Sequence, residues 1–320
     1  MPIITNPELC YNSSMATTAV VIPTFNCRAI LLRGLARLFE TLPPSHRVIV
    51  VDSGSSDGTA EALRQVFPQV LLIEGDPSLW WAAATNLGVE KARALGCQYV
   101  LTYNDDNLAM PNLFAALAQA AKNAPQSIVA AVCCYADKPN TIFFAGRMRA
   151  MGSDRFYYLN MDQPLSVLEQ GLRRADLLHG MCTLFPISVF DQVGLFNQKD
   201  FPQVHADDDL LLRASRAGFS LHVALAAVVL NDRSKTGINP YDRRLGLKGI
   251  FQLLFSRKSS FQLGARSRFL WYHRRSLISF GKTWLCDYAR LFAVLAARWF
   301  LPLRAFDWVG VRWRQRMQDK

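Results

Sequence analysis

The 320-residue sequence lacks a hydrophobic run long enough to cross a membrane, and it lacks a cysteine pattern that binds zinc. Its longest apolar stretch without a charged residue, 217–230, has 14 residues and contains His222, whereas a spanning helix needs roughly 20. The seven cysteines form no C-x-x-C pair, and their odd number is typical of a reducing compartment. Residues 1–15 have no basic start, and prolines interrupt their apolar residues, so we expect no secretion signal. These absences predict a cytoplasmic protein.

Charged residues are few, at 19%, while 51% of residues are hydrophobic, which excludes disorder for the chain as a whole. Residues 241–320 hold 17 basic against 4 acidic residues and five of the seven tryptophans. Basic residues mixed with aromatic ones suit an anionic bilayer surface. A helical extension with a solvated basic face would show the same composition. Nucleic acid is not an expected partner, because no helix-turn-helix, zinc-finger or RNA-binding signature accompanies the charge.

The first half of the chain alternates short apolar runs with segments of helical periodicity. The apolar runs are rich in β-branched residues and predict strands over 18–23, 47–51, 70–73 and 99–103. Helical spacing predicts helices over 30–42, 57–67 and 82–95, and a further helix from Pro111. This alternation indicates an α/β fold with a mainly parallel central sheet flanked by helices. Such sheets bind ligands at the carboxyl ends of their strands.

The second half is less regular, and its last part has a helical, basic pattern. Strands are expected over 128–134 and 221–230, a hairpin-like region over 143–158, and short helices over 186–193 and 207–217. The change of pattern predicts a domain boundary near 234–240, followed by a C-terminal helical extension. We find no internal repeat and no low-complexity tract.

Polar residues directly follow three of the predicted strands. Asp52 ends the second strand, where a carboxylate has no capping role, although the S-G-S-S loop after it is also typical of a turn with a helix cap. Asp105 and Asp106 follow the fourth strand within N-D-D-N. Adjacent carboxylates repel each other, and Mg²⁺ or Mn²⁺, which take oxygen ligands and bridge substrate phosphates, would relieve that repulsion. A solvated acidic turn is the alternative.

A second acidic cluster, Asp207-Asp208-Asp209, opens the helix predicted over 207–217. The helix macrodipole favours acidic residues at this end, so a single aspartate would need no functional explanation. Three in succession exceed what capping uses. A carboxylate held near a bound hydroxyl can act as a general base.

Several motifs occur in order between about residues 18 and 220. They read V-V-I-P-T-F-N, V-V-D-S-G-S-S-D-G-T, W-A-A-A-T-N-L-G and Y-N-D-D-N, followed by V-G-L-F-N-Q and H-A-D-D-D-L-L-L-R. Together they resemble the family 2 glycosyltransferases, and more narrowly their rhamnosyltransferase-like bacterial members. The resemblance implies a GT-A fold and an inverting transfer of a sugar, possibly rhamnose, from a nucleotide diphosphate sugar to a hydroxyl acceptor. It implies a catalytic domain over 16–237, with a nucleotide-sugar-binding half (16–110) and an acceptor-binding half (111–237), before the extension 238–320.

The resemblance also implies roles for individual residues. The donor would be bound by Pro23, Thr24, Asp52, Asp57, Asn86 and Asp105. Counting back from Pro111 places Asp106 on the most dependable position of the family's metal motif, as a ligand of Mg²⁺ or Mn²⁺. Counting back from Arg213 places Asp207 on the catalytic base and Asp209 on the acidic position two residues later.

Three positions depart from the family pattern. Asn104 replaces the first aspartate of the metal motif, Ala206 replaces a glutamate, and Asn231 stands where many members have a metal-binding histidine. They leave open a second hypothesis, a catalytically impaired scaffold of a polysaccharide assembly complex. A nucleotidyltransferase would need a glycine-rich basic loop after the first strand, and residues 25–28 are not such a loop. Trp80-Trp81 would either stack on a sugar or pack in the core.

The charge distribution and the resemblance together predict an enzyme at the inner face of the cell membrane. Its acceptor would be a saccharide or glycolipid in cell-surface polysaccharide synthesis, and the extension would contact the anionic membrane surface. In 284–300, Trp284, Tyr288 and Leu291 share one side of a helix, as in a helix lying in a bilayer interface. A helix packed on the catalytic domain would show the same pattern. No oligomeric state is predicted.

Overall fold

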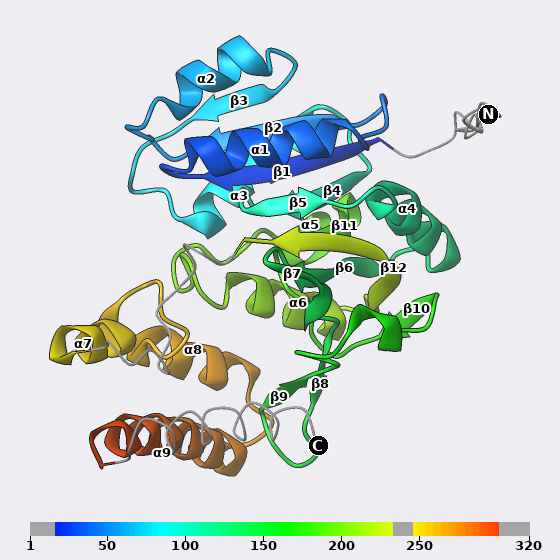
Figure 1. Ribbon diagram of the computed structural model, residues 1–320. Coiled ribbons are helices and arrows are strands. Elements are labelled where there is room, and N and C mark those ends of the chain that lie inside the picture. The colour runs from blue at the N-terminus through cyan, green and yellow to red at the C-terminus, as the bar shows by residue number, and fades with distance from the viewer. Residues whose placement is uncertain (1–16, 233–245, 301–320) are drawn as a thin grey trace, which may run out of the picture.

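The computed structural model describes residues 17–232 and 246–300 (Figure 1). Its main sheet has ten strands in the order β10-β12-β6-β11-β4-β1-β2-β3, with β5 paired to β12 and β7 to β6. These strands are β1 Thr18–Thr24, β2 Arg47–Asp52, β3 Leu71–Glu74, β4 Tyr99–Tyr103, β5 Asn107–Ala109, β6 Ile128–Tyr135, β7 Lys138–Phe144, β10 Leu172–Arg174, β11 Cys182–Pro186 and β12 Leu221–Asn231. The strands β8 (Arg147–Arg149) and β9 (Phe156–Tyr158) form a separate antiparallel hairpin.

The strands predicted in the first half pair in parallel, as β6 and β12 of the second half also do. β1 pairs in parallel with β2 and β4, and β2 pairs in parallel with β3. β1 is buried along its whole length, so its sequence is an unbroken apolar run. β11 runs antiparallel to both β4 and β6, which makes the complete sheet mixed. The predicted α/β architecture with flanking helices is confirmed.

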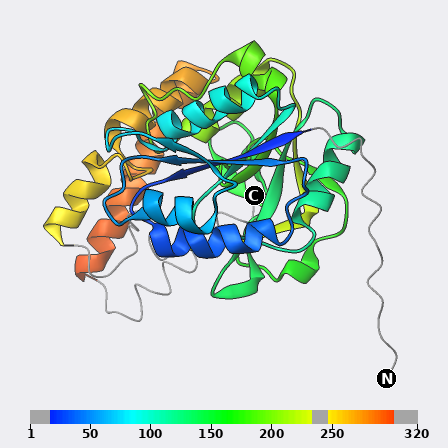
Figure 2. The ribbon, with the colours of Figure 1, turned by 90° about the horizontal axis from the view of Figure 1, so that it is seen from above.

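Helices cover both faces of the sheet (Figure 2). One face packs against α1 (Arg28–Phe39), α2 (Thr59–Val66) and α4 (Leu113–Asn123), which share a buried cluster with alternate residues of β1 and β2. The opposite face packs against α3 (Trp81–Ala94), α5 (Ile187–Val193) and α6 (Ala206–Arg216). The carboxyl ends of β1, β2 and β4 therefore meet at one edge, between these two helical layers.

Between residues 246 and 300 the chain forms three helices, α7 (Leu247–Phe255), α8 (Leu263–His273) and α9 (Leu277–Phe300). α8 docks on the layer that contains α6, because its Ala265, Phe269 and Leu270 belong to the same buried cluster as Leu210. In Figure 1, α8 lies between α6 and α9. The helix α8 is thus packed against the rest of the protein.

The apolar side expected of the helix over 284–300 faces the protein interior. Tyr288, Leu291 and Leu295 of α9 are buried in one cluster with Leu253 of α7. The sequence allowed this side either to lie in a bilayer interface or to pack on the protein, and the structure shows that it packs on the protein. Within 17–232 and 246–300, no helix combines the length and the apolar character that a membrane span requires. The boundary predicted near 234–240 lies outside the described residues.

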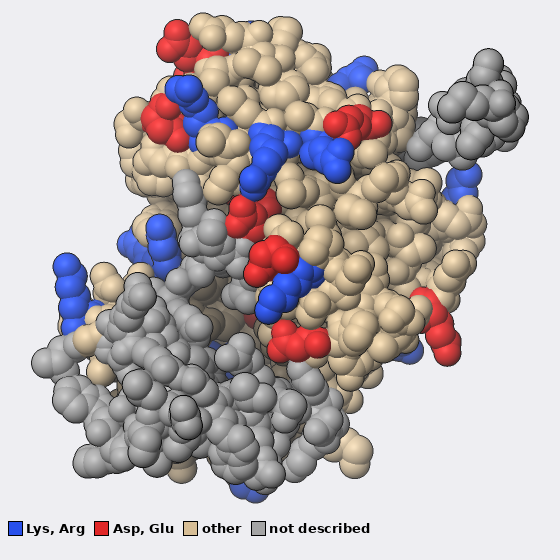
Figure 3. Space-filling model, viewed as in Figure 1, with Lys and Arg blue, Asp and Glu red and all other residues tan. Residues whose placement is uncertain are grey.

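Acidic and basic side chains are intermingled on the face of the molecule seen in Figure 3. Arg33 of α1, for example, pairs with Asp232 just after β12 at 2.9 Å, and Arg37 pairs with Glu40 at 2.9 Å. These exposed pairs contribute little to stability, about 1 kcal/mol or less each. They are consistent with the nearly balanced charge of the first 240 residues.

Candidate active site

A pocket of about 280 Å³ opens at the carboxyl ends of β1, β2 and β4, and we call it the Trp81 pocket. Of the predicted donor-binding residues, Pro23, Thr24 and Asp105 line it, together with Ser53. The Thr24 hydroxyl donates to Asp105 at 2.8 Å, which joins the ends of β1 and β4. The parallel sheet therefore brings these predicted residues together.

The other three predicted donor-binding residues shape the surroundings of the pocket. Asp52 is buried and accepts from the backbone N–H of Ser55 at 3.0 Å, which fixes the loop after β2. Asp57 accepts from the backbone N–H of Arg28 at 2.9 Å. Asn86 accepts from the Phe196 N–H at 3.0 Å and donates to the Phe196 carbonyl at 2.9 Å, so it ties α3 to the segment after α5.

Trp81 packs in the core, which is one of the two roles that the sequence left open, and it also borders the pocket. It lines the pocket, and its ring packs edge-on against Phe196 at 5.2 Å between ring centroids. Its indole N–H donates to Asn104 at 3.1 Å. The asparagine that replaces an acidic residue at position 104 thus has a defined partner in this protein.

Asp106 follows Asp105, which lines the pocket. Its carboxylate accepts a hydrogen bond of 2.8 Å from the side chain of Asn231, the last residue of β12. Burial and the charge of Asp105 raise the pKa of Asp106 to about 7, against an ordinary value of 3.8. A nearby cation would offset both effects. Asp105 and Asp106 supply hard oxygen donors, and the described residues contain no cluster of three or more metal-binding side chains. The oxygen donors of Asp105 and Asp106 are of the type that Mg²⁺ and Mn²⁺ take from one or two carboxylates, with phosphates and water as the remaining ligands.

A second pocket, of about 570 Å³, lies on the other side of Gly180, and we call it the Asp207 pocket. Asp207 is in the first turn of α6, and its carboxylate accepts from the Gly180 N–H at 2.7 Å. A β-carbon at position 180 would lie 2.8 Å from the Trp81 ring and 3.0 Å from Cβ of Asp207. Glycine at this position therefore lets the two pockets approach each other. The sequence assigned no role to Gly180, because its neighbours Trp81 and Asp207 come from distant parts of the chain.

The three consecutive aspartates of α6 have different surroundings. Burial and the neighbouring charge of Asp208 raise the pKa of Asp207, and Arg147 offsets this only in part. Burial would also raise the pKa of Asp208, but an ion pair with Arg147 and a contact with His205 hold it well below its usual range. Of these two neighbouring carboxylates, Asp207 therefore has the higher proton affinity, as a general base requires.

Asp209 points away from both pockets. It is 2% exposed and bonds to the Arg213 guanidinium at 2.9 Å, and His273 Nε2 lies 2.9 Å from its other oxygen. Arg213 in turn donates to the Leu195 carbonyl at 2.9 Å. Asp209 thus connects α6 to α8 and to the segment after α5, which is a structural position for this acidic candidate.

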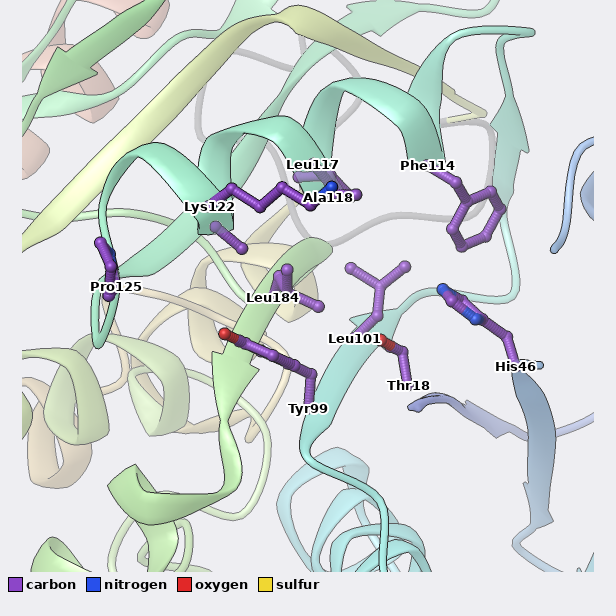
Figure 4. A pocket seen from close by; sticks show the side chains of 11 residues that line it. Thr18, His46, Tyr99, Leu101, Phe114, Leu117, Ala118, Lys122, Pro125 and Leu184 are labelled. Carbon is purple, nitrogen blue, oxygen red and sulfur yellow. The ribbon is translucent and has the colours of Figure 1, made fainter. Parts of the chain in front are cut away.

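A third pocket, of about 260 Å³, lies at the amino ends of β1 and β4, under α4 (Figure 4). Leu101, Phe114 and Leu184 give it an apolar wall, and His46 reaches into it. Burial lowers the pKa of His46 to about 4, so its ring is neutral at pH 7. None of the predicted site residues lines this pocket, and it lies at the opposite strand ends from the Trp81 pocket.

Comparisons with known proteins agree with this geometry. A family model described as glycosyl transferase family 2 matches residues 19–192. N-acetylglucosaminyl-diphospho-decaprenol L-rhamnosyltransferase of Mycobacterium tuberculosis is 27% identical over 245 residues, which cover 69% of this chain and 78% of that protein.

Two solved structures show the same fold. Mannosyltransferase PcManGT from Pyrobaculum calidifontis, in complex with GDP-Man and Mn²⁺, has a TM-score of 0.54 and 17% identity, with 96% of this chain and 82% of that chain covered. GalNAc-T7 with UDP, GalNAc and Mn²⁺ has a TM-score of 0.56 and 13% identity. That likeness covers 69% of this chain and 45% of the longer GalNAc-T7 chain.

The different surroundings of Asp207 and Asp209 predict opposite effects on stability. Asp209→Asn is expected to lower the free energy of unfolding by at least about 2 kcal/mol, because it breaks a buried charged network. Asp207→Asn is expected not to lower it, since the raised pKa means that ionised Asp207 costs stability in the folded protein at neutral pH. Urea unfolding at pH 7 measures both variants. Equal losses would contradict the structural role of Asp209.

Proposed function

Because the chain belongs to glycosyl transferase family 2, it is a nucleotide-sugar-dependent glycosyltransferase, and we propose that it inverts the sugar during transfer. The observation that carries this proposal is the close approach at Gly180 between Trp81, which lines the first pocket, and Asp207, which lines the second. A nucleotide diphosphate sugar in the first pocket would lie next to a hydroxyl acceptor in the second. Asp207, on the wall between them, is placed to accept the proton of that hydroxyl.

The residue types suit this chemistry. The acceptor oxygen attacks the anomeric carbon as the bond to the diphosphate breaks, and its proton passes to the Asp207 carboxylate. Mg²⁺ or Mn²⁺ bound at Asp106, with Asp105 beside the donor, would neutralise the negative charge of the departing diphosphate. A single carboxylate at the sugar suffices for inversion, so no covalent intermediate is required.

The three departures from the family pattern have structural partners, which favours an enzyme over a scaffold. Asn104 accepts from Trp81, and Asn231 donates to Asp106. Ala206 is fully buried at the start of α6, where it belongs to the main core cluster. These substitutions leave Asp106 and Asp207 in place, so they give the scaffold hypothesis little support.

We propose a lipid-linked acceptor and rhamnose as the transferred sugar. The support is the Mycobacterium tuberculosis relative, whose name specifies L-rhamnosyl transfer to N-acetylglucosaminyl-diphospho-decaprenol. The Asp207 pocket has room for a sugar and its diphosphate, and its walls include Phe143, Phe156 and Tyr157. Aromatic rings of this kind pack against the apolar faces of sugars and against lipid chains. The reaction would belong to cell-surface polysaccharide or glycolipid synthesis.

We further propose that α9 contacts the inner face of the membrane through the side opposite its buried face. Ile278, Leu285 and Phe292 recur every seven residues, which places them on one stripe of the helix. Their side chains are 70%, 64% and 53% exposed, so they form a row of apolar side chains on the surface of the helix. Phe251 and Phe255 of α7 are also exposed, and the basic C-terminal quarter favours an anionic bilayer.

The base assignment predicts the behaviour of Asp207→Asn. The variant is expected to lose about 10²- to 10⁴-fold in kcat while donor affinity stays unchanged. In the unsubstituted protein, kcat should decrease as the pH is lowered, because protonated Asp207 cannot act as a base. The midpoint of this decrease should lie above pH 3.8, the ordinary pKa of an aspartate, because the pKa of Asp207 is raised. Transfer assays with nucleotide diphosphate rhamnose donors and a GlcNAc-diphospho-lipid measure both effects.

The exposed Asp137→Asn is the matched control for this experiment and should retain full activity. Unchanged kcat in Asp207→Asn would sink the base assignment. Absence of transfer with any nucleotide sugar in the unsubstituted protein would count against the proposed enzyme activity and for the scaffold.

The membrane proposal predicts weaker vesicle binding in the double variant Leu285→Ser/Phe292→Ser. The full chain is expected to float with anionic vesicles at low salt, and the variant is expected to lose most of this binding, because two exposed apolar anchors are removed. Val66→Ser is the control, since Val66 is 56% exposed on α2 in the first half of the chain. Equal flotation of all three proteins would rule out this stripe as the membrane contact.

A further inference from the structure

One carboxylate in the Asp207 pocket binds two guanidinium groups. Arg155, just before β9, donates from Nε and Nη2 to one oxygen of Asp287 on α9, at 3.2 and 2.8 Å. Arg266 of α8 donates from Nε and Nη2 to the other oxygen, at 3.1 and 2.5 Å. We call Arg155 and Arg266 the paired arginines. All three side chains line the pocket that contains Asp207.

This part of the pocket has an excess of positive charge. Near Asp207, the charge of Asp208 is balanced by its ion pair with Arg147. At the wall built from α8, α9 and the segment before β9, the paired arginines face a single carboxylate, Asp287. The balance within this group is two cations against one anion, a net charge of plus one. A pocket of this kind favours an anionic ligand.

The paired arginines are fixed in position and still have donors to offer. Each uses Nε and Nη2 on Asp287, and within 17–232 and 246–300 the Nη1 group of neither makes a hydrogen bond. Their side chains are only 23% and 18% exposed, so neither samples solvent freely. Planar guanidinium groups with fixed orientation are well suited to phosphate oxygens, and prior fixing reduces the entropy cost of binding.

We propose that the paired arginines bind a phosphate group of the acceptor, and that the C-terminal helices thereby complete the acceptor site. This inference rests on the proposed glycosyl transfer, because Asp207 in the same pocket defines where the acceptor hydroxyl lies. The sugar would occupy the end near Asp207, its anionic linkage would contact the paired arginines, and the lipid would leave past the aromatic wall. The acceptor class is therefore a sugar attached through phosphate or diphosphate to an apolar chain.

A purely structural role for the same residues makes a different prediction. If Asp287 and the paired arginines only joined α9 to the rest of the protein, their loss would affect all acceptors equally. If they bind phosphate, their loss should affect phosphate-bearing ligands alone. Single substitutions suit this comparison, because Arg155→Gln leaves Asp287 paired with Arg266, and Arg266→Gln leaves it paired with Arg155.

The first test is binding of geranyl diphosphate and of geraniol to the full chain, measured by calorimetry in EDTA so that no metal-dependent binding contributes. We expect the unsubstituted protein to bind geranyl diphosphate more tightly than geraniol. Arg155→Gln and Arg266→Gln should each weaken geranyl diphosphate binding about tenfold and leave geraniol binding unchanged. Arg275→Gln, an exposed position just after α8, is the matched control and should bind as the unsubstituted protein does. Equal affinity for both ligands, or equal affinity in all variants, would overturn the proposal.

The second test compares transfer to a GlcNAc-diphospho-lipid and to octyl N-acetylglucosaminide, a neutral acceptor. The two variants should raise KM about tenfold for the diphosphate acceptor only, with KM for the donor unchanged. Loss of activity with both acceptors to the same degree would indicate a structural role and contradict the proposal. Absence of transfer in the unsubstituted protein would instead refute the proposed function, while the binding experiment would still test the paired arginines.

Discussion

The arrangement of this protein depends on how three consecutive carboxylates are accommodated at the start of α6. Burying three such groups side by side is unfavourable unless positive charge compensates them. Arg147 and His205 contact Asp208, while Arg213 and His273 contact Asp209. Only Asp207 is left at a pocket with a backbone N–H as its direct partner. The neutralised neighbours therefore determine which carboxylate can exchange a proton with a ligand.

The same network integrates the C-terminal helices into the site. His273 belongs to α8, and His205 Nε2 lies 3.3 Å from the Ser260 carbonyl just before that helix. The ring of His205 also stacks on Phe269 of α8, with centroids 4.7 Å apart. Because α8 is held against α6 in this way, α9 and its Asp287 reach the wall of the Asp207 pocket. The helices α8 and α9 thus help to shape this pocket.

The sequence predicted features that depend on local pattern and missed those that depend on distant pairing. The apolar run of β1 and the position of Thr24 after it predicted that Thr24 and Asp105 would meet at one edge of the sheet, since parallel strands align their ends. Gly180 could not be predicted, because its neighbours Trp81 and Asp207 come from distant parts of the chain. Arg155 was missed for the same reason, as its partner lies 132 residues away. For α9, periodicity indicated an amphipathic helix, but the same period describes a helix on a bilayer and a helix on a protein.

The most direct test of the account is calorimetric titration of a panel of nucleotide sugars with and without Mn²⁺, using the unsubstituted protein and Asp106→Asn. The account predicts that one donor binds only when Mn²⁺ is present and that Asp106→Asn loses this binding, because the carboxylate bonded to Asn231 holds the metal. Donor binding that is equally strong without metal, or unchanged in Asp106→Asn, would contradict a metal-assisted nucleotide-sugar site at this edge of the sheet.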